Sequence, residues 1–390
     1  MPPSPTEILK SYFQFTEFRG LQEKVIERLL SGAPGHSLVI MPTGAGKSLC
    51  YQIPALCLSG KTLVLSPLIA LMQDQVDGLK SRGIPADFIN STVSPRDRLQ
   101  RLEDFQYGDT KLLYVTPERF RKADFAERIR RMDISLLAVD EAHCISEWGH
   151  DFRPDYSRAG EFRKQMGNPL TIALTATATD KVQSDIIRSL NLSSEEVKIY
   201  HQGIDRPNLR LEAVDVMGDN EKLDAITGTH SKYPGSGIVY FSLIKTLERF
   251  SDLLDRRNLP HEIYHGKLDS TQRKATQNRF MNSDGLILAT NAFGMGVDKP
   301  DIRFVIHAEV PGSIESYYQE IGRAGRDGSP SLCQLLYDQE DLLIHMDFIK
   351  WSNPEPDFYR KIYALLENAG QKINSLGIDF LREQLVYKIR

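Results

Sequence analysis

Short apolar runs and longer amphipathic segments alternate along most of the chain. In the first half the apolar runs are residues 36–41, 61–66, 112–115, 135–140 and 170–175, several of them rich in Val, Ile and Leu. Segments 67–83 and 94–108 lie between these runs and carry apolar residues at helical spacing. Apolar strands separated by helices are typical of a parallel sheet with helices on both faces. This half therefore predicts an α/β fold.

The same alternation starts again in the second half of the chain. Strand-like runs occupy residues 237–241, 261–265, 286–290, 304–310 and 333–337, with helical patterns at 242–258 and 269–282. Gly203 and Pro207 interrupt both patterns. We therefore predict two α/β domains, residues 1–205 and 206–350, joined by a short linker. Residues 351–390 predict an amphipathic helical tail, which ends without a stop signal and leaves open a longer natural chain.

Composition places the chain among ordinary globular proteins. Of 390 residues, 41% are hydrophobic and 26% charged, enough apolar material for more than one core. There is neither a bilayer-length apolar run nor the pattern of a signal peptide. We expect a soluble protein that is not secreted and has no membrane partner, acting in the cytoplasm or on the nucleoid, or in the nucleus of a eukaryote.

Cysteine spacing and net charge exclude little. The four cysteines form no CxxC pair, which favours buried apolar side chains over disulfides or a zinc site. A formal net charge of −4 counts mildly against a nucleic-acid binder, but a local basic surface is all that such a protein requires. Residues 119–132 are locally basic, and we interpret them as a solvated helix face.

The segment MPTGAGKS (residues 41–48) has the setting of a phosphate-binding loop, after a predicted strand and before a predicted helix. Gly44 and Gly46 would let backbone N–H groups face an anion. Lys47 would contact the β- and γ-phosphates, and the Ser48 hydroxyl would bind Mg²⁺. The general pattern has glycine where this chain has Met41, so the match is incomplete. A simple glycine-rich turn is the disfavoured alternative.

Two acids end the predicted strand at residues 135–140. Asp140 would hold Mg²⁺, partly through water, because this ion keeps much of its hydration. Glu141 would orient and deprotonate the attacking water. An isolated acid pair would more often be a solvated strand end. Downstream of a phosphate loop, it indicates hydrolysis of a nucleoside triphosphate.

An arginine pair lies in the second half. Arg323 and Arg326 are three residues apart, so on a helix they would share a face. Two arginines on one face can clamp a γ-phosphate, and an arginine finger contributes on the order of 10³–10⁵ in rate. Without the motifs of the first half, an ordinary surface pair would be the better interpretation.

Together these segments resemble the superfamily 2 helicases, and within them the RecQ family of DNA helicases. The similarity spans most of residues 10–345, and MPTGAGKS is this family's own form of the phosphate loop. The other matching segments are FTEFRGLQ (15–22), LSPLIALMQDQV (65–76), DEAH (140–143), LTATAT (174–179), IDRPNL (204–209), ATNAFGMGVDKPDIRFVIH (289–307) and QEIGRAGRDG (319–328).

This resemblance implies two tandem RecA-like domains with ATP and Mg²⁺ bound between them. The implied nucleotide contacts are Phe15, Arg19, Gln22, Thr43, Gly44, Ala45, Gly46, Lys47, Ser48 and Asp298. The implied catalytic residues are Lys47, Asp140, Glu141, His143, Arg323 and Arg326. Gln22 would read the adenine, and segment 174–179 would link the ATP state to domain closure.

The resemblance also implies that the segment after DEAH contacts single-stranded DNA. Trp148 and Phe152 offer faces on which bases stack, at about 1–3 kcal/mol per base. Arg153 can pair with phosphate or stack as a cation. In sequence these aromatics alternate with glycine, acid and proline, which favours an exposed loop over a core segment. Thr290 and Asn291 would contact the strand from the second domain, and His143 would connect the acids to the loop.

The expected activity is ATP-driven 3′-to-5′ movement on single-stranded and partly duplex DNA, in repair or recombination. The family's four-cysteine zinc region has no counterpart after Cys333, so we expect no zinc site in these residues. That departure raises an alternative, a translocase or remodeller that does not unwind duplex efficiently. A scaffold with a dead ATP site is a third possibility, disfavoured because Lys47, Glu141 and Arg326 are present. Protein partners stay open.

Overall fold

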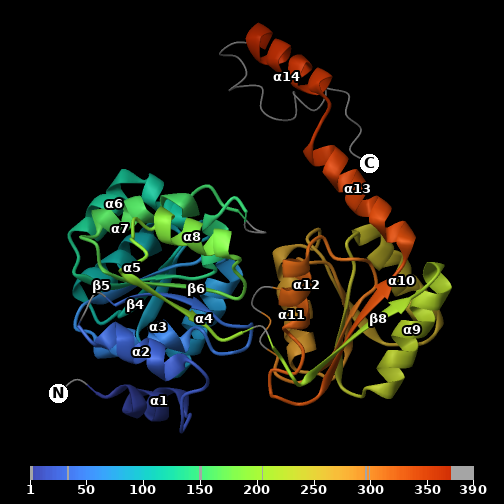
Figure 1. The fold of residues 1–390 in the computed structure, drawn as a ribbon, viewed down its shortest axis with the longest axis horizontal. Coiled ribbons are helices and arrows are strands. Elements are labelled where there is room, and N and C mark those ends of the chain that lie inside the picture. The colour runs from blue at the N-terminus through green and yellow to red at the C-terminus, as the bar shows by residue number, and fades with distance from the viewer. Residues whose placement is uncertain are drawn as a thin grey trace. The chain divides into compact units, whose positions relative to one another are not determined.

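The computed structural model describes residues 3–32, 35–148, 152–203, 205–294, 297 and 299–369. The chain divides into a compact unit that ends at Leu336 and a second unit that begins at Tyr337. Two sheets organise the first unit (Figure 1). We call the part built on the first sheet, up to His201, the first lobe, and the part built on the second sheet, from Leu209 to Leu336, the second lobe.

The sheet of the first lobe has seven strands in the order β3-β4-β2-β5-β6-β1-β7, and each neighbouring pair is parallel. Its strands are β1 (His36–Ile40), β2 (Lys61–Leu65), β3 (Ala86–Ile89), β4 (Leu112–Val115), β5 (Ile134–Val139), β6 (Leu170–Thr175) and β7 (Val197–His201). Because β6 lies between β5 and β1, the segments that follow these three strands meet at one edge of the sheet. Ligands bind at such carboxyl edges in open α/β sheets.

Helices cover both faces of this sheet, as predicted. They are α1 (Pro5–Phe13), α2 (Gln22–Leu30), α3 (Leu49–Cys57), α4 (Ile69–Ser81), α5 (Pro95–Tyr107), α6 (Ala123–Arg130), α7 (Ala159–Gln165) and α8 (Asp180–Ser189), with short 3₁₀ turns at Pro117–Arg121, Ala142–Ile145 and Tyr156–Arg158. Neighbouring residues of β1 alternate between the two cores: Leu38 and Ile40 pack with α5 to α8, and Val39 packs with α1 to α4.

The second lobe repeats this arrangement on a six-stranded sheet, ordered β10-β11-β9-β12-β13-β8. Its strands are β8 (Leu209–Asp215), β9 (Ser236–Tyr240), β10 (His261–Tyr264), β11 (Leu286–Ala289), β12 (Ile302–His307) and β13 (Ser331–Tyr337). Its helices are α9 (Gly218–Lys232), α10 (Ile244–Arg256), α11 (Ser270–Met281) and α12 (Ile314–Ile321). Residues of α9 and α10 pack on one face of the sheet, and Phe280 and Ile321 of α11 and α12 pack on the other.

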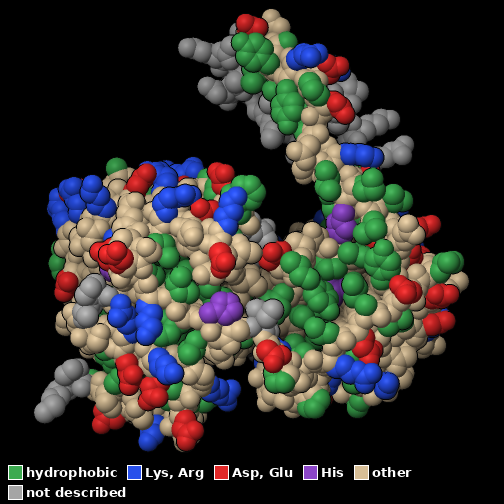
Figure 2. Space-filling view, in the orientation of Figure 1, with side chains coloured by type: hydrophobic (Ala, Val, Ile, Leu, Met, Phe, Trp, Pro, Cys, Tyr) green, Lys and Arg blue, Asp and Glu red, His purple; other side chains and the backbone are tan. Residues whose placement is uncertain are grey.

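The C-terminal unit is helical where it is described, as expected for the tail. It contains a 3₁₀ turn (Gln339–Asp341), α13 (Leu342–Ser352) and α14 (Pro356–Ala369). No residue of α13 is buried, and Figure 2 shows hydrophobic side chains along these helices. The boundary predicted at residue 350 falls inside α13, and the one at 205 falls between the two sheets; both remain proposals.

The locally basic segment 119–132 has one solvated face, as interpreted from the sequence, while its apolar residues Phe120, Phe125, Ile129 and Met132 are buried in the core. Figure 2 shows Lys and Arg side chains gathered over α6 and α7. Two of these arginines, Arg130 and Arg131, pair with Glu127 at 2.8 and 2.7 Å. Such exposed pairs contribute about 0–1 kcal/mol. Among the residues described, no helix is long and apolar enough to cross a membrane.

Candidate active site

The phosphate loop joins β1 to α3 and holds its lysine against its own backbone. Gly44 and Gly46 have φ angles of +82° and +76°, which only glycine adopts without strain. Lys47 Nζ donates to the carbonyl oxygens of Met41 and Pro42 at 3.0 and 3.4 Å. Burial lowers the pKa of Lys47, while nearby Glu141 and Asp140 oppose that shift. Phosphate oxygens would take over from the carbonyls as partners of this ammonium group.

Met41 occupies the place of the missing glycine for a packing reason. Its side chain is buried in the core formed with α1 to α4, and its N–H donates to the carbonyl of Thr175 in β6. A larger side chain at this position therefore extends the core to the start of the loop. Its backbone still provides the carbonyl that Lys47 contacts.

The predicted adenine-binding residues lie beside this loop. Gln22 is buried at the start of α2, and its Nε2 donates to the carbonyls of Ala45 and Gly46 at 3.1 and 3.2 Å. Its Oε1 accepts the backbone N–H of Arg19 at 2.9 Å. The Arg19 guanidinium stands 5.7 Å from the ring centre of the exposed Phe15. The structure therefore brings Phe15, Arg19 and Gln22 together next to the phosphate loop.

The acid pair occupies a sharp corner after β5. Asp140 is buried; its N–H donates to the Leu65 carbonyl and its Oδ1 accepts the Glu141 N–H at 3.0 Å. Glu141 adopts the left-handed conformation, with φ and ψ both 48°, an uncommon state for a residue other than glycine. Strain of this kind costs on the order of 1–3 kcal/mol and gathers at functional sites. Because of this left-handed turn, the side chains of Asp140 and Glu141 do not alternate between the two faces of the sheet as successive strand residues do.

Glu141, the second acid of the pair, lies close to His143. Glu141 Oε2 is buried and makes no hydrogen bond within the described residues, although it lies 3.4 Å from His143 Nδ1. The same nitrogen is 2.9 Å from Thr175 Oγ1, which donates to the Thr177 carbonyl. Residues 140–143 are thereby joined to segment 174–179 through one imidazole ring.

The arginine pair lies beyond α12, so the shared helical face predicted for it is wrong. The helix ends at Ile321, and Gly322 and Gly325, the latter with a φ of +55°, turn the chain instead. Arg323 is nevertheless buried, and a β-carbon at Gly294 would come within 2.5 Å of its Nη2. We call residues 322–328 the arginine loop.

One cavity is lined by the phosphate loop and Glu141 of the first lobe and by both arginines of the second lobe. Its volume is about 320 Å³, and its lining includes Lys47, Ser48, Glu141, Arg323 and Arg326. A β-carbon at Gly44 would lie 3.0 Å from Cγ of Arg326, so that side chain passes directly over the phosphate loop. The structure therefore places four of the six predicted catalytic residues on one cavity, and the other two, Asp140 and His143, lie within two residues of Glu141 in sequence.

Two further cavities continue from this one. The second, of about 230 Å³, shares Glu141 and Arg323 with the first and adds His143, Arg153 and Asn291. A third, of about 250 Å³, shares His143 with the second and reaches Trp148. The path from the phosphate loop to Trp148 thus runs past His143.

The predicted nucleic-acid residues differ in exposure. Trp148 is 67% exposed, whereas Phe152 and Arg153 are half-buried. Arg153 Nη1 donates to the Pro67 carbonyl at 2.5 Å, so its guanidinium faces the second cavity. In the second lobe Thr290 is buried and Asn291 is exposed. Gly149, His150 and Asp151, and likewise Asp298, lie outside the described residues.

The chain resembles known proteins over most of its length. Residues 19–186 match the DEAD/DEAH box helicase family and residues 219–328 the helicase conserved C-terminal domain. ATP-dependent DNA helicase RecQ of Bacillus subtilis is 44% identical over 89% of this chain and 58% of its own. The probable ATP-dependent DNA helicase RecS of the same organism is 39% identical over 94% of this chain and 73% of its own. The chain belongs to the RecQ family of superfamily 2 helicases.

Solved structures support the fold of this RecQ-family core. Dbp5 of S. cerevisiae, bound to RNA and ADP BeF3, superposes with a TM-score of 0.69 over 94% of this chain and 97% of its own, at 16% identity. That likeness concerns the two-lobed fold alone. The chain spans 52–58% of the length of the RecQ relatives from Pasteurella multocida and Bacillus subtilis.

The donor set of this RecQ-family site fits magnesium and a triphosphate. Asp140 is a buried carboxylate whose pKa is raised because burial and Glu141 both penalise its charge, beyond what Lys47 and the Glu141 N–H offset. A divalent cation would remove that penalty. Within the described ranges no group of three or more His, Cys, Asp or Glu residues is arranged to hold a metal alone. Magnesium usually takes only one or two carboxylates and completes its shell with water and phosphate.

Sequence reasoning missed two residues that the structure places at this RecQ-family site. Lys181, in the first turn of α8, stands with Nζ 3.0 Å from the ring centre of Trp148. Arg206, in the linker, donates to the Thr43 carbonyl of the phosphate loop at 3.2 Å. The sequence contains a lysine soon after LTATAT and an arginine in IDRPNL, but it does not indicate their contacts, because Trp148 and Thr43 are distant in sequence.

Proposed function

We propose that this chain is the motor of an ATP-dependent DNA helicase that moves 3′ to 5′ along single-stranded DNA. The observation that carries the proposal is the single cavity lined by Lys47 and Glu141 from one lobe and by Arg323 and Arg326 from the other. Hydrolysis then requires both lobes, so each cycle of ATP binding and release changes their separation. The polarity and the DNA substrate are expectations from the family.

In the hydrolytic step, Lys47 leaves its backbone carbonyls and contacts the β- and γ-phosphates. Glu141 orients water and accepts its proton, since Oε2 has no hydrogen bond among the described residues. Arg323 and Arg326 stabilise the charge of the transferred phosphoryl group. Magnesium, held by the Ser48 hydroxyl and by Asp140 partly through water, would neutralise phosphate charge. Gln22, Arg19 and Phe15 would hold the adenine.

The strand would cross both lobes on the side of Trp148 and Asn291. Trp148 has an exposed face for a base, and Lys181 beside it can contact a phosphate. His143 lies between this surface and Glu141, which supports coupling of strand binding to hydrolysis. We expect the protein to act where chromosomal DNA is, in the cytoplasm or nucleoid, or in the nucleus of a eukaryote, in repair or recombination.

The test begins with ATP hydrolysis measured with and without single-stranded DNA. We expect strong stimulation by DNA. The Lys47→Ala variant should lose turnover both with and without DNA. Equal turnover with and without DNA would contradict the coupling. Forked, 3′-tailed and 5′-tailed duplexes, each as DNA and as RNA, then define the substrate. Unwinding of 3′-tailed DNA supports the helicase, whereas translocation on single strands without unwinding supports the remodeller.

A further inference from the structure

The linker contributes one guanidinium group to the junction between the phosphate loop and the arginine loop. Arg206 Nη1 donates to the carbonyls of Thr43 and Gly322 at 3.2 and 3.4 Å. Its Nη2 donates to the carbonyls of Ala324 and Gly325 at 2.9 and 3.0 Å. One side chain thus joins segments that are 116–163 residues away from it in sequence. Burial lowers the pKa of Arg206, and nearby Tyr318 and Cys333 oppose that shift.

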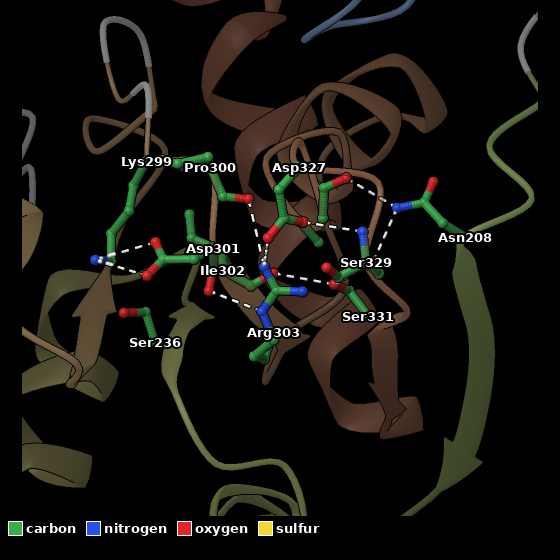
Figure 3. Close-up of polar contacts among 12 residues, drawn as sticks. Asn208, Ser236, Lys299, Pro300, Asp301, Ile302, Arg303, Asp327, Ser329 and Ser331 are labelled. Atoms are coloured by element: carbon green, nitrogen blue, oxygen red, sulfur yellow. Dashed lines mark hydrogen bonds and ion pairs between the residues drawn. The ribbon is translucent and has the colours of Figure 1, made fainter.

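The arginine loop has a second set of contacts, made by residues of its own lobe and by Asn208 of the linker. Figure 3 shows Arg303 of β12 reaching Asp327, with Nη2 and Oδ2 separated by 2.5 Å. In the same view Asn208 Nδ2 donates to the Ser329 carbonyl at 3.1 Å. Asn208 Nδ2 also donates to the Gly325 carbonyl at 2.8 Å. These contacts hold the end of the loop to the second sheet and do not involve the first lobe.

Arg206 differs from Arg303 because its guanidinium reaches across to the first lobe. Its shorter bonds, to Ala324 and Gly325, hold it to the arginine loop, and the longer bond, to Thr43, joins that loop to the phosphate loop. The two loops also touch directly: a β-carbon at Gly322 would lie 3.1 Å from Cβ of Thr43. The planar fork of arginine can serve several acceptors at once, which the single ammonium group of lysine does less well.

We propose that Arg206 is a positioning residue that sets the place of Arg323 and Arg326 over the phosphate loop. It is not among the residues that line the cavity of Lys47 and Glu141, and it acts through the backbone of both loops. When the lobes separate, the bond to Thr43 breaks while those to Ala324 and Gly325 persist, so Arg206 stays with the arginine loop. When the lobes close, the bond forms again and fixes the register of the two loops. This inference rests on the proposed ATP-driven motor.

The experiment compares Arg206→Ala and Arg206→Lys with Arg303→Ala as the matched control. Arg303 supports the same loop but has no contact with Thr43, so its variant measures the effect of loosening the loop alone. A misplacement of about 1 Å can lower a rate about 100-fold. We expect Arg206→Ala to lower the DNA-stimulated kcat by about 10- to 100-fold, with KM for ATP changed by less than about threefold. Arg206→Lys should recover part of kcat, and Arg303→Ala should cost less than about threefold.

A double-variant cycle separates positioning from general support. If Arg206 acts through the two arginines, Arg206→Ala should lower kcat by a clearly smaller factor in an Arg326→Ala background than in the wild type, because only Arg323 is left to position. Additive losses in the double variant, or equal losses in the Arg206→Ala and Arg303→Ala proteins, would overturn the inference. The two hypotheses fail differently. Wild-type protein without DNA-stimulated hydrolysis refutes the motor and this inference with it, whereas normal kcat in Arg206→Ala refutes the inference alone.

Discussion

His143 and Thr175 are joined by a short contact of 2.9 Å between Nδ1 and Oγ1, although 32 residues separate them. The sheet order explains the contact, since β6, which ends at Thr175, is the neighbour of β5, which precedes His143. The same imidazole nitrogen lies 3.4 Å from Glu141 Oε2. A shift of the segment after β6 therefore changes the surroundings of the proposed general base.

Replacing Thr175 with valine should weaken the coupling between DNA binding and hydrolysis. Valine keeps the shape of threonine but cannot make the contact with His143, and a lost hydrogen bond corresponds to about 1 kcal/mol. We expect stimulation by single-stranded DNA, the ratio of kcat with DNA to kcat without it, to fall about five- to tenfold. The matched control is Thr177→Val, whose backbone rather than side chain receives the Thr175 hydroxyl. Equal falls in both variants would remove His143 from the coupling path.

Trp148 and Lys181 should contribute separately to binding of single-stranded DNA. Trp148→Ala removes a stacking surface and should weaken binding by about 1–3 kcal/mol. Lys181→Gln removes one phosphate contact and should lower the slope of log K against log salt by about 0.7 for a single strand. Fluorescence anisotropy with an oligonucleotide over a range of salt concentrations measures both effects. Trp148→Ala should leave DNA-independent ATP hydrolysis unchanged. Loss of that basal hydrolysis would show that the segment around Trp148 has a structural role.

The sequence predicted the parts of this protein whose signals are local. Apolar runs located ten of the thirteen strands found in the described part of the chain. The residue types around Lys47 and Asp140 indicated a phosphate loop and an acid pair from sequence alone. β7 and β8 were missed because both lie at sheet edges with largely exposed or half-buried residues, so neither has a continuous apolar run. β3 was missed because Asp87 divides its apolar residues.

Features that depend on distant backbone were beyond sequence reasoning. The acceptors of Arg206 are carbonyl groups, which every residue carries, so no letter at residues 43 or 322–325 indicates the contact. The left-handed conformation at Glu141 could not be predicted, because the residue there is not glycine. The arginine pair was assigned to a helix from its spacing, and the two glycines between and before the arginines ended that helix instead.

Glu141→Gln should abolish hydrolysis while keeping nucleotide binding. The amide has the size of the carboxylate but cannot accept a proton from water, and a general base contributes typically about 10²–10⁴ in rate. We expect kcat to fall by that factor and the Kd for a fluorescent ATP analogue to change by less than about threefold. Lys47→Ala provides the contrast, because it should weaken nucleotide binding itself. Retention of more than a tenth of the wild-type kcat would assign the proton transfer to another group.

Asp140→Asn should stabilise the metal-free protein at alkaline pH while it inactivates the enzyme. The pKa of Asp140 is raised from 3.8 to about 7, mainly by burial and then by Glu141. Between these two values the folded protein binds a proton that the unfolded chain does not, so this group makes the free energy of unfolding fall as pH rises through that window. Asparagine carries no charge, so the variant lacks this decrease in the free energy of unfolding with rising pH.

Thermal unfolding in EDTA at pH 5 and pH 8 tests this expectation. The variant should melt a few degrees above wild type at pH 8, with a smaller difference at pH 5, where much of the penalty is absent. Asp74→Asn is the matched control for loss of a carboxylate, because Asp74 lines the same cavity as Glu141, the neighbour of Asp140. Magnesium with a non-hydrolysable ATP analogue should reverse the order at pH 8, because only the wild-type carboxylate gains a cation. A variant that melts below wild type in EDTA at pH 8 would mean that the Asp140 charge is already compensated by Lys47 alone.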